Sequence, residues 1–360
     1  MAERLPRKTI KVLHCIHSIY GGGAEKQLRI LSVGGSDVDL ESAVYCHDNR
    51  VEELSSSGVE IFVNKKSHFD LISSYMAVNS AIKASKPDVV HVWLPPAVTV
   101  PAMLACFVNK KPCVASYRNK MFFGSVKNYV EYLFALMFSV TVISNNPVSQ
   151  SSYFFRKLFN FKKGKEIPNA VSVNDRVRWK PSCDDEFRFL FVGRLTKQKN
   201  LGYLITALSN ISTVKKWTLT VCGEGEDRSD LIGLTNRLGL NEVVDFIGYC
   251  DNIHEVMIQH HMLVLPSRYE GMPNVAVEAM VLGLPCALSD IESHRWVVCG
   301  SDHALFFNLD KIDSLEKILV SSVDSHFDLD CMSSKGVEFT KKYSVGALLD
   351  NYRQAYEEIC

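Results

Sequence analysis

The chain has 360 residues, with 40 Lys or Arg and 40 Asp or Glu, so its formal net charge is zero at neutral pH. This length accommodates about two α/β domains of ordinary size. The balanced charge gives no support to nucleic-acid binding, which relies on a surplus of basic residues.

Cysteine usage and hydropathy indicate a cytoplasmic protein. The eleven Cys are dispersed without a C-x-x-C pair, which is typical of free thiols and argues against a disulfide framework or a zinc site. Residues 1–11 lack the apolar centre of a signal peptide. The most lipid-like run, residues 132–143, is shorter than the ~20 residues that a spanning helix needs. We therefore expect no transmembrane segment.

Apolar runs that predict buried strands alternate with helical patterns in the first half of the chain. This alternation predicts a parallel sheet in a doubly wound domain. The predicted strands are residues 9–18, 42–46, 59–63, 88–93, 113–116 and 140–144. The predicted helices are a segment through Leu31 and residues 71–84, 101–107, 128–138 and 148–158.

Three features of the first half are candidates for ligand contact, each with a structural alternative. Gly22 and Gly23 lie in a strand-to-helix turn, where glycine lets a ligand approach the backbone or simply makes the turn tight. His91, near the end of a predicted strand, is either a ligand-side group or a buried structural residue. Arg118, in a basic strand end, either meets an acceptor phosphate or is solvated.

A basic and aromatic segment, residues 153–165 (YFFRKLFNFKKGK), contains four Phe, one Tyr and five Lys or Arg. Such a surface is suited to an anionic membrane. An ordinary amphipathic helix with its aromatic side chains in the core would have the same composition. Both interpretations stay open.

The second half repeats the alternation after a polar segment, residues 176–186, that is typical of a linker. Five turns that could hold a ligand each follow an apolar strand, and ligands bind at the carboxyl ends of strands in an open parallel sheet. The predicted strands are residues 187–192, 218–222, 243–247, 261–266, 285–289 and 304–307, and the predicted helices include 312–320 and 344–359.

The turn at residues 193–200 (GRLTKQKN) carries residue types that recognise a diphosphate. Gly193 permits close approach, and Arg194 and Lys199 supply two cations. Two surface charges near a turn are the plain alternative.

The turn at residues 267–280 (SRYEGMPNVAVEAM) places two acids beside a helix end. Glu270 is predicted to lie in a loop and Glu278 about two turns into an amphipathic helix that starts at Pro273. The unbonded N–H groups of a helix N-terminus favour an oxyanion, and two flanking carboxylates could hold sugar hydroxyls. A pair of solvated acids is the plain alternative.

Together these motifs resemble glycosyltransferase family 4, which contains retaining GT-B enzymes of bacterial surface-polysaccharide synthesis. The matching elements are E-x7-E at Glu270 and Glu278, G-R-L-x3-K-N from Gly193, GG-A-E from Gly22, and I-P-N-x-V at residues 167–171. The resemblance implies two Rossmann-like, doubly wound parallel-sheet domains facing a cleft. Residues 1–170 would form the acceptor-side domain and residues 171–343 the donor domain, with the helix 344–360 packing back on the first.

The resemblance also implies roles for the matched residues. Arg194, Lys199 and Glu270 would be catalytic, with the two cations stabilising the departing nucleotide diphosphate. Glu278 would bind the ribose. His91 and Arg118 would lie on the acceptor or sugar side, although Trp93 or Pro96 stands where the family often has a second histidine. The donor-binding candidates are Gly22, Gly23, Gly193, Gly223, Tyr249, Ile253, Met272, Asn274, Val275 and Glu278.

The implied reaction moves a sugar from a nucleotide-sugar donor, UDP-linked in our prediction, to a saccharide acceptor with retention of configuration. No D-x-D sequence follows a predicted strand, so we expect no required metal and no other cofactor. Residues 153–165 favour a lipid-linked acceptor, with the protein cytoplasmic and peripheral at the inner face of a bacterial membrane. Two alternatives remain: a degenerate homologue that binds nucleotide sugar as a partner or sensor, and a periplasmic-type binding protein.

Overall fold

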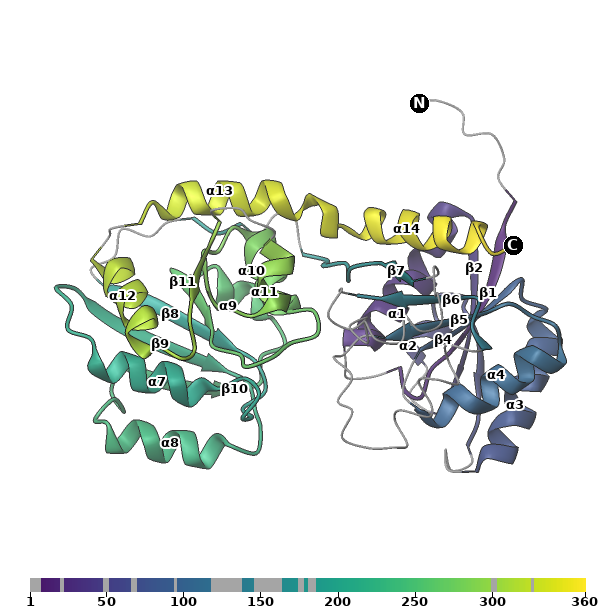
Figure 1. The fold of residues 1–360 in the computed structure, drawn as a ribbon, viewed down its shortest axis with the longest axis horizontal. Coiled ribbons are helices and arrows are strands. Elements are labelled where there is room, and N and C mark those ends of the chain that lie inside the picture. The colour runs from purple at the N-terminus through teal and green to yellow at the C-terminus, as the bar shows by residue number, and fades with distance from the viewer. Residues whose placement is uncertain are drawn as a thin grey trace. The chain divides into compact units, whose positions relative to one another are not determined.

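The computed structural model describes two compact units. The first comprises residues 1–170 and 345–360, and the second comprises residues 171–344 (Figure 1). Each unit is considered by itself. The structure describes residues 8–19, 23–47, 52–65, 70–93, 96–117, 138–145, 164–173, 178–180, 186–298, 303–324 and 327–360.

The first unit is built on a seven-stranded sheet with the order β3-β2-β1-β4-β5-β6-β7, and every neighbouring pair is parallel. The strands are β1 (Ile10–Cys15), β2 (Leu40–Cys46), β3 (Glu60–Val63), β4 (Val89–Trp93), β5 (Cys113–Tyr117), β6 (Thr141–Ser144) and β7 (Gly164–Glu166). The sequence pattern did not predict β7, which includes the last part of the basic and aromatic segment. Because residues 164–166 pair with β6 at the edge of the sheet, this part of the segment is a strand and not a helix. Lys165 also forms an ion pair with Glu358 at 2.6 Å.

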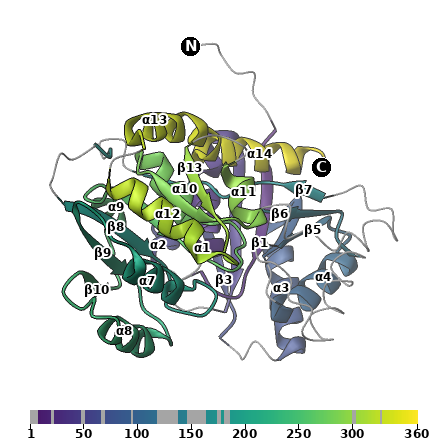
Figure 2. The same cartoon turned by 60° about the vertical axis from the view of Figure 1, so that its left-hand side comes forward.

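Helices cover both faces of this sheet because successive residues of a strand point to opposite sides. Val12 packs in a core with α1 (Gly23–Gly34) and α14 (Val345–Glu357). Leu13 packs in a second core with α3 (Leu71–Ser85) and α4 (Pro96–Val108). Figure 2 shows α3 and α4 side by side. The other helices in the described part of this unit are η1 (Gly35–Val38) and α2 (Glu52–Ser55).

Two helix boundaries in the first unit bear on the sequence predictions. Asp70 caps α3 by accepting a hydrogen bond from the Ser73 N–H at 2.9 Å, and the helix ends before Pro87, as predicted. Helix α4 begins at Pro96, five residues before the predicted start, and contains Pro101. The helices predicted at residues 128–138 and 148–158 lie outside the described residues, except for Phe138. Phe138 is helical.

The second unit is built on a six-stranded sheet with the order β10-β9-β8-β11-β12-β13, again parallel throughout. The strands are β8 (Glu186–Val192), β9 (Lys216–Cys222), β10 (Val244–Gly248), β11 (Met262–Leu265), β12 (Cys286–Ser289) and β13 (Ala304–Phe307). The strand order reverses between β8 and β11. Ligands bind at such a switch point in open α/β sheets, outside the carboxyl ends of the strands.

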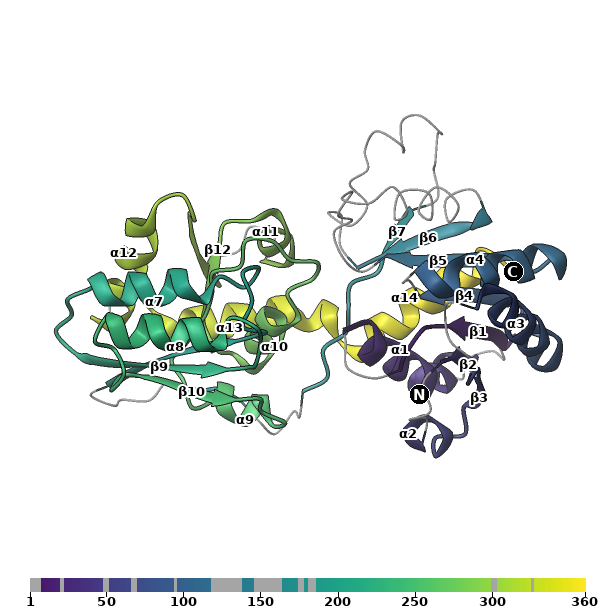
Figure 3. The same ribbon diagram turned by 90° about the horizontal axis from the view of Figure 1, so that it is seen from below.

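Two cores flank this sheet as well. Phe189 and Phe191 of β8 pack with α7 (Leu201–Asn210), α8 (Arg228–Arg237) and α12 (Ile312–Val323), and Figure 3 shows α7 and α8 side by side. Leu190, on the other face, packs with the opposite set of helices. That set comprises α9 (Ile253–Met257), α10 (Asn274–Leu282), α11 (Glu292–Val298), α13 (Leu329–Phe339) and the turn η3 (Thr340–Tyr343).

Two predictions for the second unit need correction. Helix α10 starts at Asn274, after Pro273, and is not amphipathic, because six of its nine residues are buried. The segment expected to be a polar linker includes Trp179, which is buried in the second unit. The Trp179 indole N–H donates to the His260 carbonyl at 2.7 Å, and the Trp179 backbone N–H donates to the Leu282 carbonyl at 2.8 Å. This part of the segment is therefore anchored to the second unit.

Candidate functional site

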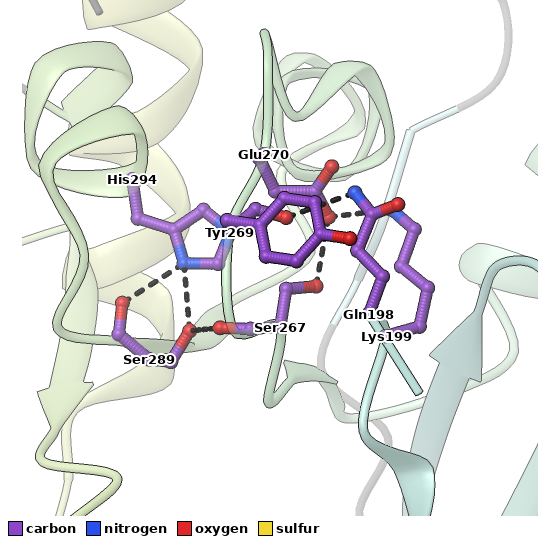
Figure 4. Close-up of polar contacts among 7 residues, drawn as sticks. All are labelled: Gln198, Lys199, Ser267, Tyr269, Glu270, Ser289 and His294. Atoms are coloured by element: carbon purple, nitrogen blue, oxygen red, sulfur yellow. Dashed lines mark hydrogen bonds and ion pairs between the residues drawn. The ribbon is translucent and has the colours of Figure 1, made fainter. Parts of the chain in front are cut away.

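The loops that follow β8 and β11 meet at the switch point of the second unit. The Arg268 N–H donates to the Gln198 carbonyl at 2.9 Å, and the Gln198 amide donates to the Tyr269 carbonyl at the same distance (Figure 4). The Asn200 amide donates to the Pro266 carbonyl at 3.2 Å. These bonds hold together two loops that are far apart in the sequence.

The centre of this junction is an ion pair between Lys199 and Glu270. The Lys199 Nζ lies 2.5 Å from Glu270 Oε1, and the Ser267 hydroxyl donates to the same oxygen at 2.7 Å (Figure 4). The side chains are only 17% and 7% exposed. Because a buried carboxylate is costly without donors, these two contacts offset part of the cost of burying Glu270 in the loop.

A third strand end supports the loop of Glu270. The Ser289 hydroxyl, at the end of β12, donates to the Ser267 carbonyl at 2.6 Å. His294 of α11 lies with Nδ1 2.9 Å from the Ser289 carbonyl, which can only accept, so Nδ1 carries the proton. A chain of hydrogen bonds thus runs from α11 through β12 to the loop of Glu270 (Figure 4).

His294 is neutral and its second nitrogen has no partner. Burial lowers the pKa of His294 to about 4, with the Ser289 carbonyl and Glu270 opposing that shift. Its Nε2 is buried and has no hydrogen-bond partner in the described part of the chain. The ring edge that bears Nε2 points toward the Glu270 loop in Figure 4.

Arg194 lies in the same turn as Lys199 and is exposed. The turn is closely packed against the next one. The Gly193 N–H donates to the Cys222 carbonyl at 3.0 Å, and a Cβ on Gly223 would lie 1.9 Å from the Gly193 carbonyl oxygen. Close backbone approach therefore explains the glycine at position 223 without any ligand.

The amino-terminal end of helix α10 differs from the sequence prediction in the position of Glu278 and in the number of unbonded N–H groups. Glu278 is the fifth residue of the helix, just past one turn, and is only 8% exposed. The N–H of Asn274 bonds to the Met272 carbonyl, and the N–H groups of Ala276 and Val277 bond to the Pro273 carbonyl. This helix end therefore has fewer unbonded donors for an oxyanion than the sequence predicted.

The remaining donor-side candidates lie farther along the same sheet edge. Met272 is buried, and Val275 is half-buried in the first turn of α10. Tyr249 follows β10 and is 78% exposed, and Ile253 begins α9. Strand β10 is two places from β8 in the sheet. Tyr249 and Ile253 therefore lie at the carboxyl edge of the sheet, and the described interactions include no direct contact between them and the Lys199–Glu270 ion pair.

The candidates in the first unit have other surroundings. Gly22 and Arg118 lie outside the described residues, and Gly23 opens α1. His91 is fully buried, with Nδ1 2.7 Å from the Tyr356 hydroxyl and Nε2 2.6 Å from the Ser116 hydroxyl. Both ring nitrogens are satisfied, which favours the structural alternative for His91.

Sequence reasoning missed three polar residues of the site. Ser267 and Ser289 ended or followed predicted strands, so their position at the carboxyl edge was visible in the pattern. Their hydrogen-bond partners were not. No sequence pattern indicated His294, because its contact with Ser289 depends on how α11 is oriented.

The fold defines a structural class. Two α/β units, each built on a parallel sheet, are the architecture of the GT-B fold. Residues 174–323, which make up most of the second unit, match the family model described as "Glycosyl transferases group 1".

Known proteins resemble this chain along different lengths. A Klebsiella pneumoniae protein, "Uncharacterized 41.2 kDa protein in cps region", is 22% identical over 97% of this chain and 99% of its own length. The Escherichia coli "UDP-Gal:alpha-D-GlcNAc-diphosphoundecaprenol alpha-1,3-galactosyltransferase" is 31% identical over 39% of this chain and 37% of its own length. The crystal structure of Anabaena Alr3699/HepE in complex with UDP and glucose superposes with a TM-score of 0.80 at 20% identity, covering 97% of this chain and 100% of that one.

Proposed function

We propose that this protein is a glycosyltransferase that moves a sugar from a UDP-linked donor to a saccharide acceptor in bacterial surface-polysaccharide synthesis. The observation that carries the proposal is the Lys199–Glu270 ion pair at the switch point of the second unit. An exposed arginine, Arg194, lies in the same turn as Lys199. This combination provides cations for a diphosphate and a carboxylate for sugar hydroxyls at one strand edge.

The proposed chemistry rests on positioning and charge. When the bond between sugar and diphosphate breaks, negative charge develops on the leaving nucleotide diphosphate, and Lys199 and Arg194 stabilise it. Lys199 already has a carboxylate partner, so a bound diphosphate shares or displaces Glu270. Ser267 remains bonded to Glu270 and keeps it oriented toward the sugar. The acceptor hydroxyl attacks from the face of the departing diphosphate and gives its proton to an oxygen of that diphosphate, so the anomeric configuration is retained.

The substrate classes are inferred from relatives. The Anabaena structure contains UDP and glucose, and the name of the Escherichia coli relative specifies a UDP-linked donor and a diphosphoundecaprenol-linked acceptor. We infer a UDP-sugar donor and a lipid-linked saccharide acceptor, with the protein at the inner face of the membrane. Among the described residues no helix is both long and apolar enough to cross a bilayer. We also propose that transfer needs no metal, which unchanged turnover in excess EDTA would support.

A second function has one observation in its favour. His91, the candidate on the acceptor side, is buried and bonded through both nitrogens, so it is not placed to act as a base. A homologue that binds nucleotide sugar without transferring it would retain the donor-side residues and lack such a base. This alternative predicts donor binding without release of nucleotide diphosphate.

Two assays on the purified protein distinguish these functions. UDP-, GDP-, ADP- and dTDP-sugars are compared by thermal shift, where a ligand at 100 times its dissociation constant stabilises the folded state by about 2.7 kcal/mol. Release of nucleotide diphosphate is then measured with lipid-linked acceptors. A selective UDP-sugar response with release supports the transferase, and a response without release supports the binding protein. No response to any nucleotide sugar would contradict both.

A further inference from the structure

Exposed apolar side chains gather on two neighbouring helices of the first unit. Six of the twelve large hydrophobic residues that are exposed among the described residues lie on α3 and α4. We call them the α3–α4 apolar face. Its members are Leu71, Ile72, Met76, Leu104, Phe107 and Val108, with exposures from 41% to 74%.

These residues form one surface because the two helices are packed together. The Asn109 amide donates to the Asn79 side-chain oxygen at 2.7 Å, which sets the end of α4 beside the middle of α3. Ile72 and Met76 are four residues apart on α3, and Leu104 and Val108 are four apart on α4, so each pair shares a helix face. The two helices lie side by side in Figure 1 and Figure 2.

Helix α4 is an unusual surface helix. It contains no charged residue, and a helix that is apolar all round is normally buried on all sides. One side of α4 is indeed buried, where Val98, Ala102 and Met103 pack against the sheet. The opposite side, with Phe107 71% exposed, faces solvent. An apolar surface of this kind marks a site of interaction.

The charged residues around the α3–α4 apolar face indicate which kind of partner would bind it. Neither α3 nor α4 contains an Asp or Glu, although the exposed Asp70 caps the start of α3. The exposed Lys83, Lys86 and Lys110 lie at the carboxyl-terminal ends of the two helices, so basic residues outnumber acidic ones around the face. Lysines bordering an apolar surface bind anionic headgroups while their stems and the apolar residues enter the interface.

We propose that the α3–α4 apolar face docks this protein on an anionic bilayer surface. The proposal assigns a surface to the membrane location inferred above and in that respect rests on the proposed function, although its test requires neither donor nor acceptor. It also differs from the sequence expectation, which placed membrane contact at residues 153–165. Of that segment, residues 153–163 lie outside the described residues.

Vesicle flotation of the full chain tests the proposal. The protein is mixed with vesicles of phosphatidylcholine, with or without phosphatidylglycerol. Wild type is expected to float with the anionic vesicles only. An apolar-face variant, with Ile72, Met76, Phe107 and Val108 each changed to Ser, is expected to lose binding about ten-fold or more. Lys83→Gln with Lys110→Gln is expected to weaken binding roughly five-fold for each lysine.

A matched control lies in the second unit. Val214 is 92% exposed and is followed by Lys215 and Lys216, so Val214→Ser with both lysines changed to Gln removes one apolar and two basic side chains elsewhere. This control is expected to float like wild type. Circular dichroism and UDP-sugar binding, unchanged in all variants, establish that each is folded.

Three results would overturn the proposal. The first is equal flotation of wild type and the folded apolar-face variant. The second is equal loss of binding in the Val214 control. The third is a wild-type dimer that the apolar-face changes convert to a monomer while vesicle binding stays unaltered, since the face would then be an interface between copies of the chain.

Discussion

Lys199 and Glu270 are 71 positions apart in the chain, yet Lys199 Nζ lies 2.5 Å from Glu270 Oε1. The pair joins the loops after β8 and β11, which are neighbours only because the strand order reverses between them. The cation that we propose for the diphosphate therefore has a carboxylate partner within the second unit. The proposed function requires a bound diphosphate either to share Lys199 with Glu270 or to displace Glu270 from it.

Breaking the ion pair is expected to affect both stability and turnover. Lys199→Met leaves the Glu270 carboxylate buried with Ser267 as its remaining described donor, which should cost about 3 kcal/mol of unfolding free energy. Turnover and UDP-sugar affinity should fall together, because the diphosphate loses a cation. Urea unfolding and steady-state kinetics measure the two effects.

The neighbouring Lys197 provides the control for that prediction. It lies in the same loop and is exposed, so Lys197→Met should change stability by less than about 0.5 kcal/mol and leave turnover intact. Adding Glu270→Gln to Lys199→Met should recover part of the stability and none of the turnover. Identical behaviour of the Lys197 and Lys199 variants would rule out a special role for the pair.

Gly223→Ala is expected to destabilise the second unit severely. The backbone at this position has φ +145°, and the new Cβ would lie 1.9 Å from the Gly193 carbonyl oxygen. The loops of Gly193 and Gly223 would have to separate, at a cost of about 3 kcal/mol or more. The comparison is Gly239→Ala, where φ is +71° and no atom lies within 4 Å of the new Cβ.

The Gly239 variant should lose only about 1–2 kcal/mol, the cost of a left-handed backbone conformation. The difference between the two variants in urea unfolding therefore contains the steric clash at Gly223 together with the difference between the two backbone conformations. Equal losses would mean that backbone conformation alone explains both glycines.

Stability is expected to fall between neutral and mildly acidic pH because of His294. Its pKa is about 4 in the folded protein and 6.5 when exposed. Below pH 6.5 only the unfolded state gains a proton, so the unfolding free energy decreases by about 1.4 kcal/mol per pH unit until pH reaches about 4. Above pH 6.5 this contribution is fully present.

Replacing His294 identifies its share of that pH dependence. His294→Gln keeps a polar side chain and removes the titration, so its unfolding free energy should vary less with pH between 6.5 and 4 than that of wild type. Urea denaturation at several pH values provides the measurement. Parallel curves for the two proteins would show that His294 does not titrate in this window.

The pair His91 and Tyr356 tests the structural role of His91. Tyr356→Phe leaves one buried nitrogen of His91 without its 2.7 Å partner, which should cost about 1–3 kcal/mol of stability. Turnover per folded molecule should stay at the wild-type level. Tyr203→Phe, which removes a more exposed bond to the Asn308 carbonyl, should cost less. A large fall in kcat for Tyr356→Phe, with stability preserved, would instead assign His91 to the reaction.

Local pattern was enough to predict most of the described elements. Strand β4 was predicted within one residue, because a run such as VVHVW between a helix and prolines has few alternatives. Strand β7 was missed because its three residues, Gly164–Glu166, have no apolar pattern and depend on pairing with β6. Helix α10 was predicted at the right position, but the prediction of an amphipathic helix with one exposed side was wrong. Burial of that side depends on the neighbouring helices, which the local sequence does not encode.

The sequence by itself determined the alternation of strands and helices and the turns that carry Arg194, Lys199, Glu270 and Glu278. These are local properties, because hydrophobic period and turn residues act within about ten positions along the chain. Only the tertiary structure decided that Lys199 meets Glu270, that Ser289 and His294 support the same loop, and that His91 is bonded inside the first unit. Such contacts join residues many positions apart, and they follow from strand order and helix packing, which no local pattern encodes.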